Sequence, residues 1–77
     1  MTYLFQLATR YRDVQVTYNI SQVQSDEYFA ESTNAEIQSF FLKRKSGGWS
    51  CDGVYEEFQA VKVGRLIDDL YVSIMQN

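Results

Sequence analysis

The chain has 77 residues and a mass of 9.0 kDa, so we predict a single compact domain over residues 1–77. It has no histidine and one cysteine, which excludes histidine-based catalysis and disulfide frameworks. The net charge is −3, so the chain lacks the surplus of basic residues that general nucleic-acid binders show. A hydrophobic content of 45% and an aromatic content of 16% are typical of a folded chain.

The sequence favours a cytoplasmic protein that does not contact membranes. Its longest uncharged apolar stretch is far shorter than the ~20 residues that a membrane-spanning helix needs. Met1 to Phe5 carry neither a basic region nor a small-residue cleavage site, so they do not resemble a signal peptide. The lone Cys51 suits a reducing compartment.

Residues 3–22 alternate apolar and polar side chains with the period of a β-strand. The apolar positions are odd up to Tyr11 and even from Val14, which indicates a hairpin. If Tyr11 pairs with Val14, the odd residues of the first strand share a face with the even residues of the second. Since Arg12-Asp13 is not a preferred tight-turn sequence, we favour a four-residue loop from Tyr11 to Val14 in the same register.

The middle of the chain predicts one short strand and one helix. Residues 24–27 resemble a turn, and we assign residues 28–32 to a strand rather than to a short helical turn. A helix over about 34–45 is indicated by a capping-box pattern, helically spaced apolar residues, a basic last turn and a glycine stop: Thr33-Asn34-Ala35-Glu36, then Ile37, Phe40 and Phe41, Lys43-Arg44-Lys45, and Gly47-Gly48. Another short strand is expected around residues 49–51.

The C-terminal segment predicts a second helix, over about residues 55–76, because its apolar residues follow helical spacing: Val63, Leu66, Ile67, Leu70 and Ile74. Gly64 would mark a kink or a true start. The alternative makes residues 54–63 a strand and confines the helix to 64–76. The predicted fold class is therefore α+β: a small antiparallel sheet of three to four strands, beginning with the N-terminal hairpin, packed by two helices.

No group of residues indicates catalysis, a cofactor or a metal site, so we predict a protein that is not an enzyme. The carboxylate pairs Glu56-Glu57 and Asp68-Asp69 are adjacent in sequence, and adjacent helical residues do not converge on one site. Cys51 has no histidine to activate it, and the neighbouring Asp52 opposes formation of a thiolate. The glycines match no phosphate-binding motif.

The aromatic surplus is the most informative functional feature: six Tyr, five Phe and one Trp exceed what so small a core can enclose. We therefore predict a non-enzymatic protein–protein interaction module, such as a small acidic adaptor, regulatory subunit or inhibitor. In a narrower form of this hypothesis, it blocks a nucleic-acid-binding machine by covering that machine's basic surface. The expected partner-binding residues are the apolar start of the first strand and an acidic run: Tyr3, Leu4, Phe5, Asp26, Glu27, Glu31 and Glu36.

We also expect a homodimer, because apolar burial and ordering entropy nearly cancel for a chain of this size. The alternative function is weak binding of RNA or single-stranded DNA through a basic run and a nearby aromatic ring: Lys43, Arg44, Lys45 and Trp49. The sequence leaves open whether the acidic or the basic run is the functional surface.

Overall fold

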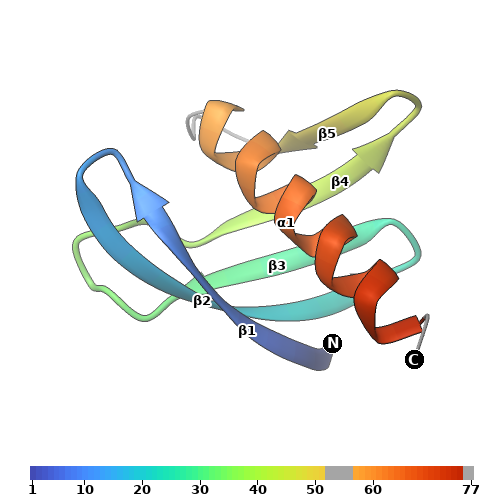
Figure 1. Ribbon diagram of the computed structural model, residues 1–77, viewed down its shortest axis with the longest axis horizontal. Helices are drawn as coiled ribbons and strands as arrows, with labels where there is room; N and C mark the ends of the chain where they lie inside the picture. Colours follow the sequence, from blue (N-terminus) through green and yellow to red (C-terminus); the bar gives the residue numbers. More distant parts are fainter. Residues whose placement is uncertain (52–56, 76–77) are drawn as a thin grey trace.

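The computed structural model describes residues 1–51 and 57–75, with side chains described up to residue 70. Five strands precede one helix: β1 (Thr2–Tyr11), β2 (Val14–Gln24), β3 (Glu27–Ser32), β4 (Phe40–Lys45), β5 (Gly48–Cys51) and α1 (Glu57–Met75). The strands lie in the sheet in chain order, and each is antiparallel to the next. α1 crosses one face of the twisted sheet, close to β4 and β5 and touching β1 (Figure 1).

The structure confirms the N-terminal hairpin and its register. Leu7 lies opposite Tyr18, and the pairing continues to the closing pair of Tyr11 and Val14. The strands extend fully to that pair, so the connection is a two-residue turn and not the longer loop that we favoured. Arg12 closes it with a φ of 56°, a left-handed conformation that few residues other than glycine adopt readily.

The predicted alternation fails only at the start of β1. The register shifts between Tyr3 and Phe5, which leaves Leu4 as the extra residue of a β-bulge. Because of this bulge, Tyr3 lies opposite Ser21 and on the other face of the sheet from Phe5. Leu4 and Phe5 both pack against the hydrophobic core.

The prediction of a helix over residues 34–45 is wrong, and with it the fold class of a three- to four-stranded sheet packed by two helices. The capping-box signal produces only a turn, in which Asn34 Oδ1 accepts a hydrogen bond from the backbone N–H of Glu36 at 2.9 Å. The Thr33 hydroxyl donates instead to the carbonyl of Thr17 at 3.0 Å. Residues 40–45 form β4 because they give β3 its second antiparallel neighbour, and their burial alternates as a strand requires.

The other elements agree better with expectation. The strands predicted over residues 28–32 and 49–51 are present as β3 and β5. Residues 57–63 are helical, which excludes the strand alternative for them, whereas residues 54–56 and 76 lie outside the described residues. Nowhere in residues 57–75 is the helix apolar enough over a sufficient length to span a bilayer.

Gly64 lies inside α1 and marks neither its start nor a kink. A Cβ atom on Gly64 would come within 2.3 Å of Trp49 Cγ, so the missing side chain is what lets the helix approach β5. The predicted helical stripe is only partly core: Val63 and Ile67 are fully buried, whereas Leu66 is half-buried and Leu70 is 36% exposed.

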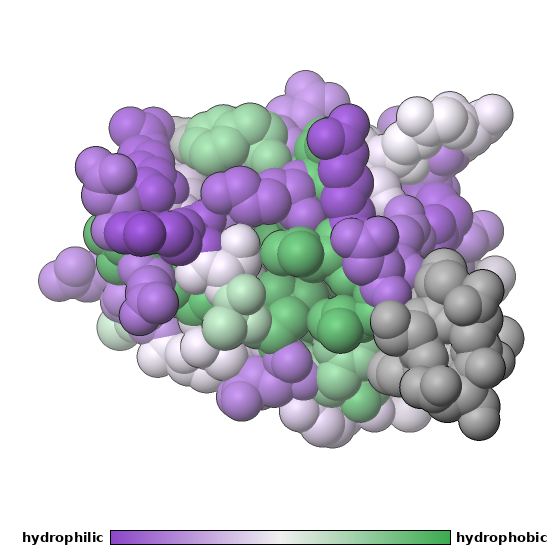
Figure 2. All heavy atoms as spheres, viewed as in Figure 1, coloured by the Kyte–Doolittle hydropathy of each residue, from purple (hydrophilic) through white to green (hydrophobic). Residues whose placement is uncertain are grey.

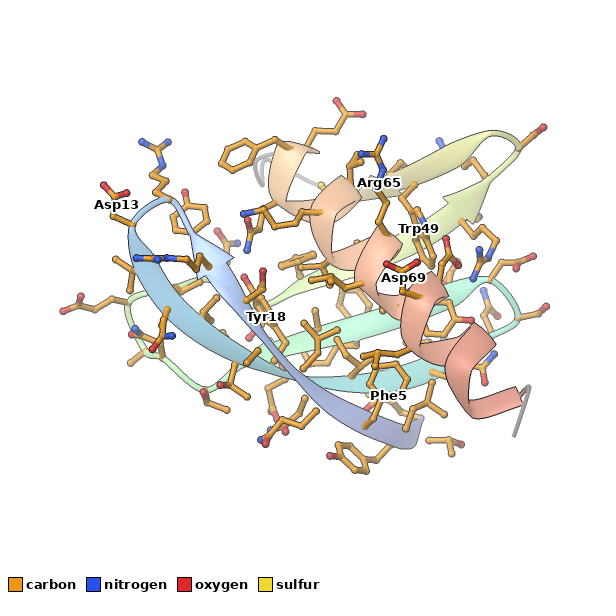
Figure 3. All side chains as sticks on the ribbon, viewed as in Figure 1. Phe5, Asp13, Tyr18, Trp49, Arg65 and Asp69 are labelled. Carbon is orange, nitrogen blue, oxygen red and sulfur yellow. The ribbon has the colours of Figure 1, made fainter. Side chains whose placement is uncertain are left out.

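The hydrophobic core fills the space between α1 and one face of the sheet. Its members come from every strand, from the β3–β4 connection and from the helix: Leu7, Val16, Tyr18, Ile20, Tyr28, Ala30, Ile37, Phe40, Leu42, Trp49, Ala60, Val63 and Ile67. The one buried polar residue among those described is Gln59, whose Nε2 donates to the hydroxyl of Tyr18 at 3.0 Å. Tyr18 projects from β2 towards the interior (Figure 3).

Candidate functional site

The acidic and basic runs singled out in the sequence are partners of each other. In the β3–β4 ladder Glu27 lies opposite Lys43, and their charged groups are 3.6 Å apart. Asp26 Oδ1 lies 3.5 Å from Arg44 Nε, and the backbone N–H of Arg44 donates to the Asp26 carbonyl at 2.7 Å. These ion pairs reduce the charge that Asp26, Glu27, Lys43 and Arg44 would present to a partner, whereas Glu31 and Glu36 pair with neither cation.

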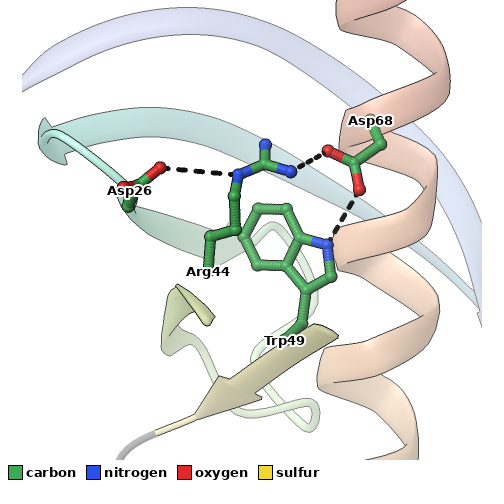
Figure 4. Close-up of polar contacts among 4 residues, drawn as sticks. All are labelled: Asp26, Arg44, Trp49 and Asp68. Carbon is green, nitrogen blue, oxygen red and sulfur yellow. Dashed lines mark hydrogen bonds and ion pairs between the residues drawn. The ribbon is translucent and has the colours of Figure 1, made fainter. Parts of the chain in front are cut away.

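Arg44 of β4 is the centre of a polar cluster that also includes Asp26 of the β2–β3 turn, Trp49 of β5 and Asp68 of α1 (Figure 4). Its guanidinium pairs with Asp68 of α1 and lies 4.5 Å from the centroid of the Trp49 ring. The Trp49 indole N–H donates to the other oxygen of Asp68 at 3.0 Å. Burial lowers the pKa of Arg44, but its hydrogen bonds to Asp68 and Tyr28 outweigh this and raise the pKa above its ordinary value. The cluster fastens α1 to β4 and β5.

The structure does not assemble the four predicted nucleic-acid-binding residues into one surface. Neighbouring residues of a strand point to opposite faces, so Lys43 and Arg44 lie on different sides of the sheet. Trp49 is only 8% exposed and packs against Tyr28, with ring centroids 5.6 Å apart. A base could not stack on an indole that is buried in this way.

An aromatic row crosses the face of the sheet opposite α1. We define it as four residues opposite one another on β1, β2, β3 and β4, namely Tyr3, Ser21, Phe29 and Phe41. Tyr3 is 59% exposed and Phe41 is 45% exposed, while the rings of Phe29 and Phe41 lie 4.6 Å apart. Their strand neighbours point into the core, so this is the uncovered face of the sheet, with no described element packed on it.

Hydrogen-bonding residues flank the aromatic row on both sides. On one side Gln6 donates to Asn19 at 3.0 Å, and Asn19 donates to Glu31 at 3.4 Å. On the other side lies the ion pair between Glu27 and Lys43. The uncovered face therefore has an aromatic centre with a polar border.

The structure separates the predicted partner-binding residues. Tyr3 belongs to the aromatic row, and Glu27 and Glu31 lie in its polar borders, whereas Leu4 and Phe5 contribute to the core. Asp26 and Glu36 lie in turns away from the row, at opposite ends of β3. The sequence analysis missed Phe29 and Phe41 as surface residues. The signal in the sequence was the alternation of residues from Phe40 to Lys43, which could have predicted that Phe41 lies on the exposed face of a strand.

Figure 2 shows the helix side of the molecule, where hydrophobic residues gather near the centre of a mainly hydrophilic surface. Within the described part of the chain, no three His, Cys, Asp or Glu residues lie close enough to share a metal ion. Comparisons of this chain with models of protein families, with curated proteins and with solved structures found no match.

Proposed function

We propose that this chain is a non-enzymatic protein-binding module that docks a protein partner on the uncovered face of its sheet. The aromatic row carries this proposal. Two large apolar side chains, Tyr3 and Phe41, are exposed there in line with Phe29, although the core lies on the other face. Binding energy at protein interfaces concentrates in aromatic residues surrounded by a polar rim, which is the arrangement of the row and its borders.

The charges of this face favour a protein over a nucleic acid. Lys43 is already paired with Glu27, and Glu31 adds an anion at the other border of the aromatic row. These carboxylates would repel phosphates on either side of any base stacked on Phe41. Against a protein, a mixture of both charges supplies specificity at little cost in affinity.

The test is quantitative capture of partners from a lysate of the source cells by wild-type protein and two single variants. Phe41→Glu places a charge in the centre of the aromatic row, and we expect it to abolish capture of the partner. Phe58→Glu is the matched control, because Phe58 is 50% exposed at the start of α1 and lies outside the row. We expect this control to capture the partner as wild-type protein does, with both variants folded by circular dichroism.

Two results would contradict the proposal. One is capture that Phe41→Glu and Phe58→Glu reduce equally, and the other is the absence of any specific partner.

The alternative function, nucleic-acid binding, is tested by titration with labelled single-stranded oligonucleotide at two salt concentrations. Salt-sensitive binding there would favour the nucleic-acid function instead.

A further inference from the structure

The outer edge of β1 carries backbone groups that no described strand pairs. β1 is the first strand of the sheet order, so only β2 lies beside it. Tyr11 and Val14 close the two-residue turn and therefore form a hydrogen-bonded pair. Since such pairs alternate along an antiparallel ladder with pairs that exchange no hydrogen bonds, three residues of β1 direct their N–H and C=O groups away from β2: Gln6, Ala8 and Arg10.

The open part of this edge is limited at both ends. The carbonyl of Arg10 accepts a hydrogen bond from Lys62 of α1 at 2.9 Å, which agrees with its outward direction and occupies that end of the strand. At the other end, the bulge at Leu4 interrupts the regular pairing. Residues 5–9 lie between these limits, and they include no charged residue and no proline to prevent pairing with another strand. A further strand can therefore add to β1 there.

A ladder of polar side chains on the uncovered face indicates which strand this is. Asn19 Nδ2 donates to Glu31 at 3.4 Å, and Gln6 Nε2 donates to Asn19 Oδ1 at 3.0 Å, so the ladder crosses three strands and ends at Gln6. Gln6 is exposed, and its Oε1 atom and the second hydrogen of Nε2 bond to none of the described residues. A primary amide with one free acceptor and one free donor is complementary to an identical amide. The side chain that completes the ladder is therefore Gln6 of a second copy.

We propose that two copies of the chain pair edge to edge through β1, as antiparallel strands in which Gln6 of one protomer lies opposite the partner's Gln6. The two residues exchange backbone hydrogen bonds, and their side-chain amides donate to each other on the uncovered face. In this register Phe5 lies opposite the partner's Leu7. Phe5 and Leu7 both contribute to the hydrophobic core, so the cores of the two copies meet across the shared edge.

This pairing has a consequence for the uncovered face. It adds strands in the plane of the sheet, which gives one continuous sheet of ten strands. Opposite residues of antiparallel strands point to the same side, so the uncovered faces of both copies also lie on the same side. The dimer therefore presents two aromatic rows together and can bind a partner at two points. The edge and the aromatic row remain separate surfaces, and either can be correct without the other.

Disulfide cross-linking tests the register. In a hydrogen-bonded pair the two Cα atoms lie about 5.5 Å apart, which suits a disulfide bond, so Gln6→Cys should yield a covalent dimer under mild oxidation. Ala8→Cys is the matched control on the same edge and face, because the two Ala8 residues would lie about 14 Å apart in this register. Wild-type protein controls for cross-linking through Cys51, which all three proteins carry. Cross-linking of Ala8→Cys as readily as Gln6→Cys would overturn the proposal.

Sedimentation equilibrium of two lysine variants tests the interface without a covalent bond. Gln6→Lys places two ammonium groups opposite each other at the centre of the contact, and we expect it to raise the dissociation constant of the dimer by about tenfold or more. Gln38→Lys introduces the same charge at an exposed position outside β1, and should leave that constant unchanged. Equal weakening by both variants, or wild-type protein that is monomeric at hundreds of micromolar, would refute pairing through β1.

Discussion

At the scale of single residues, the contact between Gly64 and Trp49 shows how strongly one position depends on tertiary structure. In an isolated helix, alanine is about 1 kcal/mol more favourable than glycine. In this fold the helix backbone at Gly64 meets the face of the indole, and there is no space for a methyl group. The sequence analysis treated this glycine as a boundary or a kink, because no local pattern reveals a partner fifteen residues earlier.

We predict that Gly64→Ala destabilises the protein by about 2 kcal/mol, since the cost of overpacking exceeds the gain in helix propensity. Urea unfolding followed by circular dichroism measures this change. Asp69→Ala is the control, because Asp69 is an exposed helical residue and its replacement should change the free energy of unfolding by less than about 0.5 kcal/mol. A Gly64→Ala variant as stable as wild-type protein would show that α1 does not pack closely on β5.

At the scale of elements, the error over residues 34–45 shows how a local signal can mislead. The first turn after Thr33 does form, with Asn34 accepting the backbone hydrogen bond of Ile37 at 3.0 Å. It does not propagate, because β3 needs a hydrogen-bonding neighbour and Phe40 and Leu42 can both reach the core only as a strand. Helical spacing of Ile37, Phe40 and Phe41 competed with the alternation of Phe40 and Leu42, and strand pairing prevailed.

The helix α1 allows a sharp comparison between two positions one turn apart. Ile67 is fully buried, so Ile67→Ala should cost about 2–5 kcal/mol, enough to unfold much of a small domain. Leu70 is 36% exposed, so we expect Leu70→Ala to cost about 1 kcal/mol and to leave the protein folded. Thermal unfolding of the two variants measures the difference. Equal losses would mean that the helix is rotated relative to the sheet.

At the scale of the whole molecule, the N-terminal hairpin could be predicted residue by residue, and the functional surface could not. The hairpin is local, and the parity switch between Tyr11 and Val14 alone determines its register. The aromatic row requires the bulge at Leu4 and the pairing of Phe29 with Phe41. These two residues lie twelve residues apart, and the sequence predicted a strand at Phe29 but a helix at Phe41. The pairing of Arg44 with Asp68 spans 24 residues and has no periodic signature.

β1 is the first strand of the sheet order, and its unpaired edge is where we expect two copies of the chain to associate. Lys62 of α1 donates to the carbonyl of Arg10 at 2.9 Å and so covers one end of this edge strand. β1 has a sheet neighbour on one side only, and Tyr3 is exposed near its start. The predicted dimer therefore centres on the N-terminal half of β1.

We predict an apparent mass near twice 9.0 kDa at micromolar concentration, with a melting temperature that rises with protein concentration. Tyr3→Glu should shift the mass towards monomer, whereas Phe58→Glu should not. Leu4→Glu is unsuitable as a test, because Leu4 packs against the core and its loss would lower stability directly. Sedimentation of a monomer at hundreds of micromolar would defeat the dimer and leave the edge of β1 unoccupied.

The chain-order arrangement of the strands also has a kinetic consequence. Each hairpin can close over a short loop, at little cost in chain entropy, so the sheet should form rapidly and from neighbouring segments. The most distant polar contacts, Lys62 with Arg10 and Gln59 with Tyr18, depend on α1. Docking of the helix thus becomes the late step of folding, and until it occurs the apolar face of the sheet is exposed to other chains.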